Sequence, residues 1–310
     1  MFDNKVILFL MGPTCVGKSF LSIELFRRCS INIINMDSSM IYRYMNIGTS
    51  KPTNDELALF KHYLIDIKDP VEFYSVGDFC RDAVSIINIC LLEKKIPCFV
   101  GGTMMYSWYL QHGLFSIPKV DPDIRNIMSH FCDLYGLSFL YDKLRFVNPV
   151  LAKNIGYNDK QRVIRALEMS YSVLNNKHDN DYLKLNYFAN NWKIINIGIV
   201  PFSKFDLCDR IEKRFDLMLK LGFIDEVRNL YNRGDLNSKM SSVRSIGYKQ
   251  IWNYLENKIS FSDLRNQSIK DTICLVKRQL TWLKKWKNKI YYIFDNDSNI
   301  INTIMKLLTR

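Results

Sequence analysis

Short apolar runs alternate with segments of helical period over the first part of the chain. Residues 6–11 form an uninterrupted apolar run, and shorter apolar runs follow at 32–36 and 98–100. Between them, residues 19–29 and 79–93 repeat apolar side chains at the spacing of one helix face. Strands that alternate with helices predict a parallel sheet covered by helices on both faces, which is an α/β fold.

The pattern changes after residue 120. Residues 121–169 keep the helical spacing without any strand-like run, and residues 175–191 are polar and rich in Asn. We therefore predict an all-helical insertion over residues 121–189, ending in a loop, between the two parts of one core, 1–120 and 190–310. The other expected elements are strands at 194–200 and 291–294, helices at 205–221, 223–233, 242–255 and 262–287, and a helix that begins at Met104.

The chain of 310 residues carries a formal net charge of +12 at pH 7. A surplus of this size suits a polyanionic partner such as a nucleic acid. The chain is also rich in Lys, Asn, Ile and Tyr, as a biased base composition of the gene would make it. That bias alone would raise the charge, so the charge by itself leaves both explanations open.

The eight cysteines and four histidines are scattered, and no two cysteines have the C-x-x-C spacing. This pattern indicates neither a zinc site nor a redox motif. Several cysteines lie inside apolar runs, as in reduced cytoplasmic proteins. The run at 6–11 is too short to span a membrane and lacks a signal-peptide pattern. We expect a cytoplasmic monomer with no membrane association.

The sequence G-x-x-x-x-G-K-[ST] stands between the first predicted strand and the first predicted helix. Its glycines let successive backbone N–H groups point at phosphate oxygens, its lysine supplies a cation, and its serine can bind Mg²⁺. The motif does not name the phosphate compound, because ATP, GTP or any other diphosphate with Mg²⁺ would satisfy it. The alternative is a glycine turn without chemistry. The residues are Gly12, Pro13, Thr14, Cys15, Val16, Gly17, Lys18 and Ser19.

Other polar groups are expected near this loop, because ligands of open parallel sheets lie beyond the carboxyl ends of the strands. Asp37 follows the second strand and could bind Mg²⁺, accept a proton or cap a helix. Thr103 follows a Gly-Gly pair after the third strand and could donate to a phosphate or cap a helix. Arg210 and Arg214 share one helix face, where they could bind a diphosphate or nucleic acid, or lie solvated beside acidic neighbours.

Eight segments, taken in order, resemble the bacterial tRNA dimethylallyltransferases, also called tRNA isopentenyltransferases. They cover nearly the whole chain. The segments are residues 12–19, 37–42, 48–52, 66–70, 101–106, 159–168, 244–250 and 277–283.

The resemblance implies a P-loop NTPase-like core that binds dimethylallyl diphosphate with Mg²⁺ and receives an adenine of tRNA. The dimethylallyl group would pass to the exocyclic amine of the adenine 3′-adjacent to the anticodon, releasing diphosphate without ATP hydrolysis. Asp37 would accept the amine proton. The diphosphate would be stabilised by Lys18, Thr103, Arg214 and Mg²⁺ at Ser19, with Arg210 as a further helper.

The resemblance also implies a set of tRNA-binding residues in the core and the insertion. One of them, Trp282, could equally belong to the hydrophobic core. The residues are Asp37, Ser38, Ser39, Met40, Thr103, Arg125, Gln161, Arg162, Val163, Ile164, Arg165, Arg244, Ser245, Ile246, Gly247, Tyr248, Lys249, Lys277, Arg278, Gln279, Leu280, Thr281, Trp282, Leu283 and Lys284.

Two other functions share parts of this pattern. A P-loop kinase of small molecules would have the same loop, Mg²⁺ and sheet, and would consume ATP. A non-catalytic RNA-binding protein could retain the loop as a vestige, but the intact Lys18, Ser19 and Asp37 argue against such decay.

Overall fold

The computed structural model describes residues 5–115, 122–175, 184–185, 187–188 and 192–309. The chain divides into two compact units. The core comprises Met1–His112 and Asn186–Arg310, and the insertion comprises Gly113–Leu185.

The core is built on a six-stranded sheet in which every pair of neighbouring strands is parallel. β1 lies inside the sheet, and its residues from Ile7 to Met11 are fully buried because β1 is covered on both faces. In spatial order the strands are β3 (His62–Tyr63), β2 (Ile31–Asn35), β4 (Ile96–Gly101), β1 (Lys5–Met11), β7 (Trp192–Val200) and β8 (Tyr291–Phe294). The five predicted core strands are confirmed. The sequence gives no signal for β3, because two half-buried residues are too few to form a pattern.

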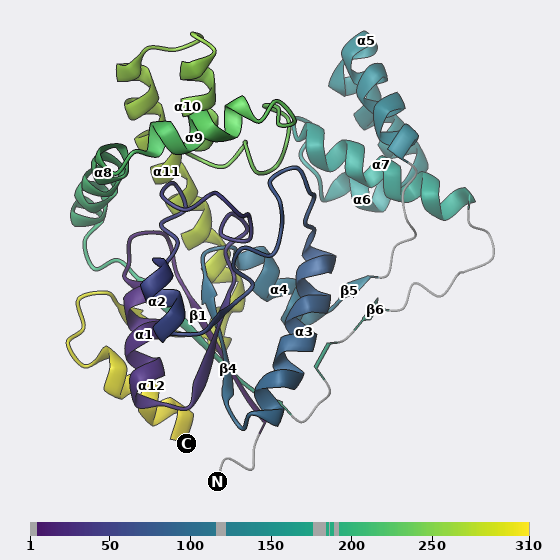
Figure 1. The fold of residues 1–310 in the computed structure, drawn as a ribbon. Coiled ribbons are helices and arrows are strands. Elements are labelled where there is room, and N and C mark those ends of the chain that lie inside the picture. Colours follow the sequence, from purple (N-terminus) through teal and green to yellow (C-terminus); the bar gives the residue numbers. More distant parts are fainter. Residues whose placement is uncertain (1–4, 116–121, 176–183, 186, 189–191, 310) are drawn as a thin grey trace. The chain divides into compact units, whose positions relative to one another are not determined.

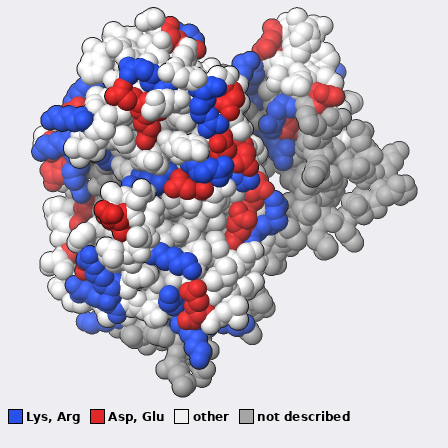
Figure 2. Space-filling view, in the orientation of Figure 1, with Lys and Arg blue, Asp and Glu red and all other residues white. Residues whose placement is uncertain are grey.

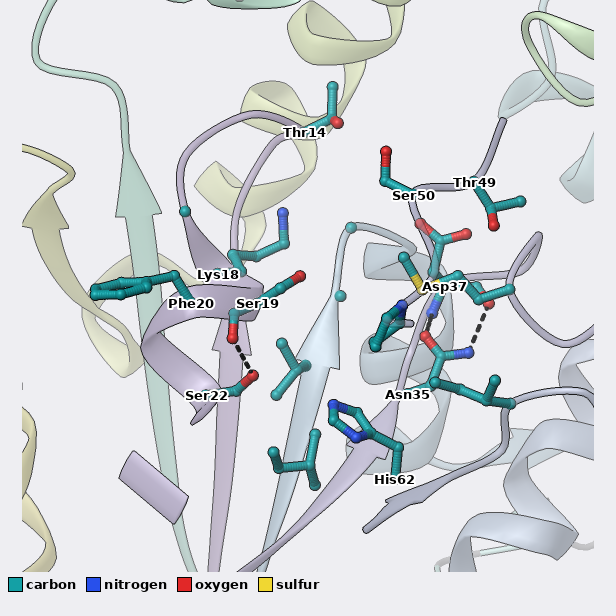
Figure 3. Close-up of a pocket in the computed structure, with 18 of the residues that line it drawn as sticks. Thr14, Lys18, Ser19, Phe20, Ser22, Asn35, Asp37, Thr49, Ser50 and His62 are labelled. Atoms are coloured by element: carbon teal, nitrogen blue, oxygen red, sulfur yellow. Dashed lines mark hydrogen bonds between the residues drawn. The ribbon is translucent and has the colours of Figure 1, made fainter. Parts of the chain in front are cut away.

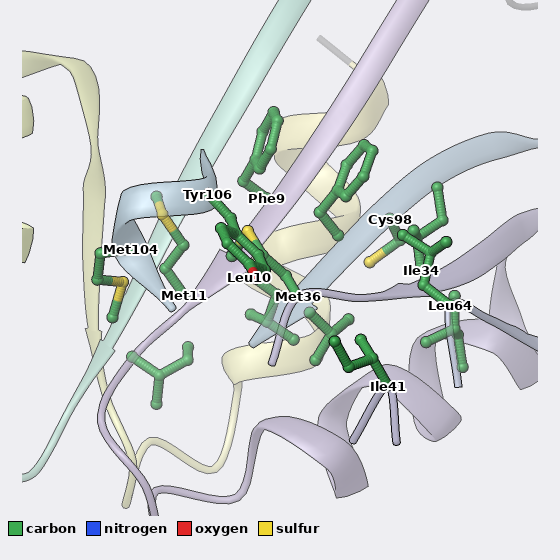
Figure 4. Close-up of a cluster of buried hydrophobic side chains, with 14 of the residues drawn as sticks. Phe9, Leu10, Met11, Ile34, Met36, Ile41, Leu64, Cys98, Met104 and Tyr106 are labelled. Atoms are coloured by element: carbon green, nitrogen blue, oxygen red, sulfur yellow. The ribbon is translucent and has the colours of Figure 1, made fainter. Parts of the chain in front are cut away.

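Helices cover both faces of this sheet (Figure 1). On one face α1 (Lys18–Arg28) packs against α12 (Ile300–Thr309). On the other, α4 (Met104–His112) contacts both α3 (Val76–Leu92) and α11 (Phe261–Leu283). Figure 4 shows buried side chains of this core, among them Phe9, Met36 and Tyr106. The remaining core helices are α2 (Asn54–Leu59), α8 (Lys204–Lys220), α9 (Phe223–Asn232), α10 (Tyr248–Leu255) and the 3-10 helix η1 (Lys284–Lys289).

Several helix boundaries differ from the predictions. α10 begins only at Tyr248, because residues before it form turns and Gly247 has a φ of 87° that no helix contains. The predicted helix at 262–287 changes at Leu283 into the tighter η1. α2 was not predicted because it buries no residue and so has no apolar stripe. α12 was also missed, although Ile300, Ile304 and Leu308 give it a buried face at helical spacing.

The insertion has a hydrophobic core of its own, formed by three helices. α5 (Pro122–Val147) is kinked at Gly136, whose φ of 82° breaks the helix. It packs with α6 (Pro149–Lys153) and α7 (Lys160–Asn175) around Leu140, Leu144, Val163 and Leu167, none more than 1% exposed.

The insertion is helical as predicted, except for one short antiparallel pair of strands. β5 (Leu114–Phe115) pairs with β6 (Lys184–Leu185), so the insertion begins and ends in strands. Two-residue strands leave no periodic signal, which is why the boundaries at 121 and 189 and the loop at 175–191 were predicted instead. The other parts of that loop, residues 176–183, 186 and 189–191, lie outside the described residues.

Candidate active site

The phosphate-binding loop joins β1 to α1, as the motif predicts. Cys15 and Gly17 both adopt left-handed backbone conformations, with φ of 64° and 83°. Gly12 is required for a different reason, since a Cβ there would lie 2.6 Å from the carbonyl oxygen of Ile199 on β7. This geometry turns the loop tightly at the end of β1 and starts α1 directly behind it.

Lys18 points back into the loop, where its Nζ donates a hydrogen bond to the carbonyl oxygen of Pro13 at 2.6 Å. The pKa of Lys18 is lowered to about 8, mainly by burial of the amine; Asp37 opposes this shift and Arg214 contributes to it. An anion bound in the loop would favour the charged form of this lysine, because an opposite charge offsets the cost of burial.

Asp37 follows the end of β2 and is fixed by its neighbours. The backbone N–H of Asp37 donates to Asn35 Oδ1 at 2.9 Å, and Asp37 Oδ1 accepts from the N–H of Ser39 at 2.8 Å. No helix begins here, so the cap alternative holds only for a local turn. Figure 3 shows Lys18 and Asp37 extending toward the same side of the sheet, with Ser50 close to Asp37.

Thr103 holds the loop that carries Asp37. Its Oγ1 accepts a hydrogen bond from the N–H of Ser38 at 3.1 Å. The two glycines before it allow backbones to meet closely. A Cβ at Gly101 would lie 2.2 Å from the carbonyl oxygen of Met36, and one at Gly102 would lie 2.3 Å from Gln279 Nε2. Both glycines are therefore required by close contacts with other parts of the protein.

Gln279 connects the two loops. Its Oε1 accepts from the N–H of Thr14 at 3.1 Å, and its Nε2 donates to the carbonyl oxygen of Gly102 at 3.0 Å. The residue is only 7% exposed. Gln279 therefore holds the two loops together, and its expected contact with tRNA stays a prediction.

Arg210 and Arg214 share one face of α8 but have different partners. Arg214 donates to Thr14 Oγ1 in the phosphate loop and, through Nε, to Ser50 Oγ at 3.0 Å. Arg210 instead pairs with the buried carboxylate of Asp295, beyond β8, at 2.5 Å. Arg210 does not line either of the two cavities at the loop. Asp295 thus holds the side chain of Arg210 away from the loop, and the expectation that Arg210 also serves the diphosphate stays a prediction without support from this geometry.

Two adjoining cavities, of about 190 and 130 Å³, meet at these residues. Both are lined by Thr14, Asp37 and Arg214. The first also includes the polar side chains of Lys18 and Ser19. One wall of the second is apolar and consists of Ile211, Phe215, Met218, Phe223, Ile246 and Leu275. Asp37 and Arg214 thus lie where the cavity at the loop meets the cavity with this apolar wall.

Comparison with known proteins decides the family. The family model IPP transferase matches residues 40–286, and the model Isopentenyl transferase matches residues 5–70. A tRNA dimethylallyltransferase of Blochmanniella floridana is 40% identical over 310 residues, covering 99% of this chain and 96% of that protein. The chain belongs to the tRNA dimethylallyltransferase family.

Other members of the family agree over the same length. The tRNA dimethylallyltransferase of Legionella pneumophila (strain Paris) is 41% identical, covering 98% of this chain and 96% of that protein. The solved tRNA isopentenylpyrophosphate transferase of Bacillus halodurans has a TM-score of 0.70 at 33% identity and covers 99% of this chain and 95% of that chain. A eukaryotic dimethylallyltransferase has a TM-score of 0.80 at 23% identity, covers 98% of this chain and 78% of that chain, and supports the fold alone.

The tRNA-binding residues expected for a tRNA dimethylallyltransferase divide by exposure. Leu283, Val163 and Ile164 are buried in the two hydrophobic cores and are not exposed to RNA. Tyr248 is 1% exposed but lines the second cavity. Gly247 is buried as well, and Leu280 packs on the core. Exposed side chains are those of Arg125, Gln161, Arg162, Arg165, Arg244, Lys249, Lys277, Arg278, Thr281 and Lys284. Ser38, Ser39, Met40, Thr103, Ser245 and Ile246 are partly exposed around the cavities.

The side chain of Trp282 packs against neighbouring side chains rather than projecting into solvent. Its ring meets Trp108 edge-on at 6.5 Å between centroids, and Lys285 Nζ lies 3.5 Å from its centroid. These contacts favour the core alternative over base stacking. On the face drawn in Figure 2, basic and acidic groups are mixed rather than gathered into one basic patch.

No sequence pattern singles out Glu226, which supports the wall of the second cavity. Its carboxylate accepts hydrogen bonds from the N–H groups of Asn46, Ile47 and Gly48 and from the hydroxyl of Tyr248 at 2.6 Å. This fixes the segment that brings Thr49 and Ser50 to the site. The role could not be predicted from spacing, because Glu226 and its loop lie about 180 residues apart in the chain.

Among the residues that the structure describes, no helix is long and apolar enough to cross a membrane. In the same part of the chain, no three His, Cys, Asp or Glu side chains come together as a metal site would need.

Proposed function

We propose that this protein transfers the dimethylallyl group of dimethylallyl diphosphate to the exocyclic amine of the adenine 3′-adjacent to the anticodon of tRNA. Membership of the family supports the reaction. The observation that carries the proposal for this site is the position of Asp37 and Arg214 where the cavity that contains Lys18 and Ser19 meets the cavity with the apolar wall.

The diphosphate would bind at the phosphate loop. Backbone N–H groups, Lys18 and Arg214 supply positive charge where the leaving group gains negative charge, which lowers the barrier to its departure. Mg²⁺ fits this site because Ser19, whose hydroxyl can bind the ion, lines the first cavity. Mg²⁺ commonly takes few protein ligands and completes its shell with phosphate oxygens and water. When bound, the ion would neutralise part of the diphosphate charge.

The apolar wall of the second cavity offers surface for the five-carbon group and the base. In the transfer, the nitrogen lone pair of the adenine amine forms the new C–N bond to the allylic carbon. The C–O bond to the diphosphate breaks, and its electron pair leaves with the diphosphate. Asp37 would accept the proton that the amine loses, as a general base. Thr103 would act on the reaction by holding the loop of Asp37 through Ser38.

The tRNA would contact exposed basic residues of the core and the insertion, including Lys277, Arg278 and Lys284. Contacts to phosphates make binding fall steeply with salt. All eight cysteines are thiols without a disulfide, which supports a cytoplasmic protein, and we propose that it acts as a monomer.

The test is to incubate the protein with Mg²⁺, labelled dimethylallyl diphosphate and unmodified tRNA, without ATP. Label on the adenine 3′ of the anticodon is the expected result. No label in this assay, together with ATP consumption in a separate assay with ATP and a small acceptor, would favour a kinase. Tight tRNA binding with neither reaction would favour a non-catalytic RNA-binding protein.

Asp37→Asn tests the role of Asp37 as a base, because the amide oxygen can still accept the hydrogen bond from Ser39 but the amide cannot take up a proton. We expect transfer to fall by about 10²–10⁴-fold, the usual contribution of a general base, with tRNA affinity unchanged. Equal loss of transfer and tRNA binding would contradict the role of Asp37 as a base.

A further inference from the structure

Within the insertion, two exposed arginines converge on one buried carboxylate. Glu168 on α7 is 0% exposed, while the side chains of Arg125 and Arg165 are 59% and 46% exposed. Arg125 makes two bonds to Glu168, from Nε to Oε1 at 2.5 Å and from Nη2 to Oε2 at 3.1 Å. Arg165 adds a third, from Nη1 to Oε2 at 3.0 Å.

Glu168 therefore holds both arginines from the buried side of the insertion. Arg165 and Glu168 lie one turn apart on α7, and Arg125 comes from the first turn of α5. A guanidinium has five N–H donors in a rigid plane. Each arginine therefore keeps donors that Glu168 does not use, while its orientation is set. The hydrogen bonds to Glu168 favour the charged form of Arg125 and raise its pKa.

Such a pair suits the phosphate oxygens or base edges of RNA. Guanidinium groups bind phosphate through two parallel hydrogen bonds, which makes their orientation matter as well as their charge. An arginine already held in position loses less side-chain entropy on binding. A free exposed arginine would lack that advantage.

We propose that Glu168 is a positioning residue for tRNA recognition, which orients Arg125 and Arg165 on the surface of the insertion toward the RNA. This inference rests on the proposed function, because it takes tRNA as the partner. Glu168 itself is buried and would not touch the RNA.

The sign of one substitution separates orientation from charge. Glu168→Gln removes a negative charge near two cations, so charge alone would tighten the binding of a polyanion. Loss of orientation would weaken it. A Gln amide has only one acceptor oxygen and an NH₂ group that cannot accept from a guanidinium, so it loses at least one of the three hydrogen bonds and sets the two arginines less firmly.

The experiment measures the Kd for unmodified tRNA by direct binding, together with the melting curve and the KM for dimethylallyl diphosphate. We expect Glu168→Gln to weaken tRNA binding by about 5–30-fold, in the range of losing well-placed guanidinium contacts. The KM for the diphosphate should stay unchanged. Asp142→Asn is the matched control, because it removes an exposed negative charge from α5, 70% exposed, and should leave the affinity unchanged or slightly higher.

A folded Glu168→Gln protein that binds tRNA as tightly as the wild type, or more tightly, would overturn the inference. If that variant fails to fold, Arg125→Lys and Arg165→Lys decide the question, since both keep the charge and lose the two-point geometry. Weaker tRNA binding with a normal melting curve supports the inference, and unchanged binding overturns it. A wild-type protein that does not bind tRNA would instead contradict the proposed function.

Discussion

The surroundings of Arg214 and of Arg210 differ completely, although the two residues lie one helical turn apart on the same face of α8. Arg214 meets the phosphate loop at Thr14 and the segment before α2 at Ser50. Arg210 meets Asp295 after β8, whose side chain is 5% exposed and also accepts from the N–H of Phe202. Residues on one helix face thus have different partners according to which distant segment reaches them.

The strongest test of this difference is Arg214→Ala. We expect kcat/KM to fall by about 10²–10³-fold, the usual cost of removing one donor that stabilises developing charge. The measurement is labelled transfer to tRNA, with a melting curve to verify the fold. Arg210→Ala should retain activity within about threefold, because its side chain does not line the cavities. Equal losses in the two variants would show that the two arginines act on one ligand after all.

The pH dependence sharpens the comparison through Lys18, whose pKa is lowered to about 8, mainly by burial. Only the protonated amine attracts a diphosphate, so kcat/KM for dimethylallyl diphosphate should fall above pH 8, approaching tenfold per pH unit. Arg214 contributes to the lowered pKa of Lys18. Arg214→Ala should therefore move this decline to higher pH, whereas Arg210→Ala should leave it in place. The affinity for inorganic diphosphate, measured from pH 6 to 10, reports the shift even where turnover is slow.

Arg210→Ala should instead reduce stability. The substitution leaves the buried carboxylate of Asp295 without its cation, although the N–H of Phe202 still donates to it. Because Arg210 is itself 40% exposed, we expect a loss of about 1–2 kcal/mol, less than for a fully buried pair. Chemical denaturation measures it. Arg210→Ala combined with Asp295→Asn should recover part of the loss, and no recovery would contradict the pairing.

Ser50→Ala should have the smallest effect. It removes one hydrogen bond from Arg214, at 3.0 Å, while Thr14 still holds the same guanidinium. This bond joins a charged guanidinium to a neutral hydroxyl at an exposed position and contributes about 1 kcal/mol, so we expect the KM for dimethylallyl diphosphate to rise by about three- to fivefold. An effect as large as that of Arg214→Ala would mean that Ser50 contacts the substrate itself.

Local sequence patterns were sufficient for the parts of the site that lie next to one another in the chain. The loop between β1 and α1 was predicted because its chemistry and its flanking elements occupy one short segment. Asp37 and Thr103 were placed correctly at the sheet edge because parallel strands share their carboxyl ends.

Contacts between remote segments were not predictable in the same way. Period and spacing identify a helix face but not the element that packs against it, so the partners of Arg210, Gln279 and Glu226 stayed hidden. The family resemblance assigned RNA contacts to whole segments. The structure divides those segments into exposed side chains such as Lys277 and buried ones such as Tyr248.

The left-handed backbone of Cys15 limits how far the phosphate motif can be transplanted. An L-residue in this conformation is disfavoured by roughly 1–2 kcal/mol, so the loop needs support from outside. Thr14 beside it is bonded to Gln279, 265 positions away, and to Arg214, 200 positions away. The eight residues that are easiest to recognise in the sequence therefore do not form a portable module. A chain cut before α11 would keep the motif and lose a contact that shapes it.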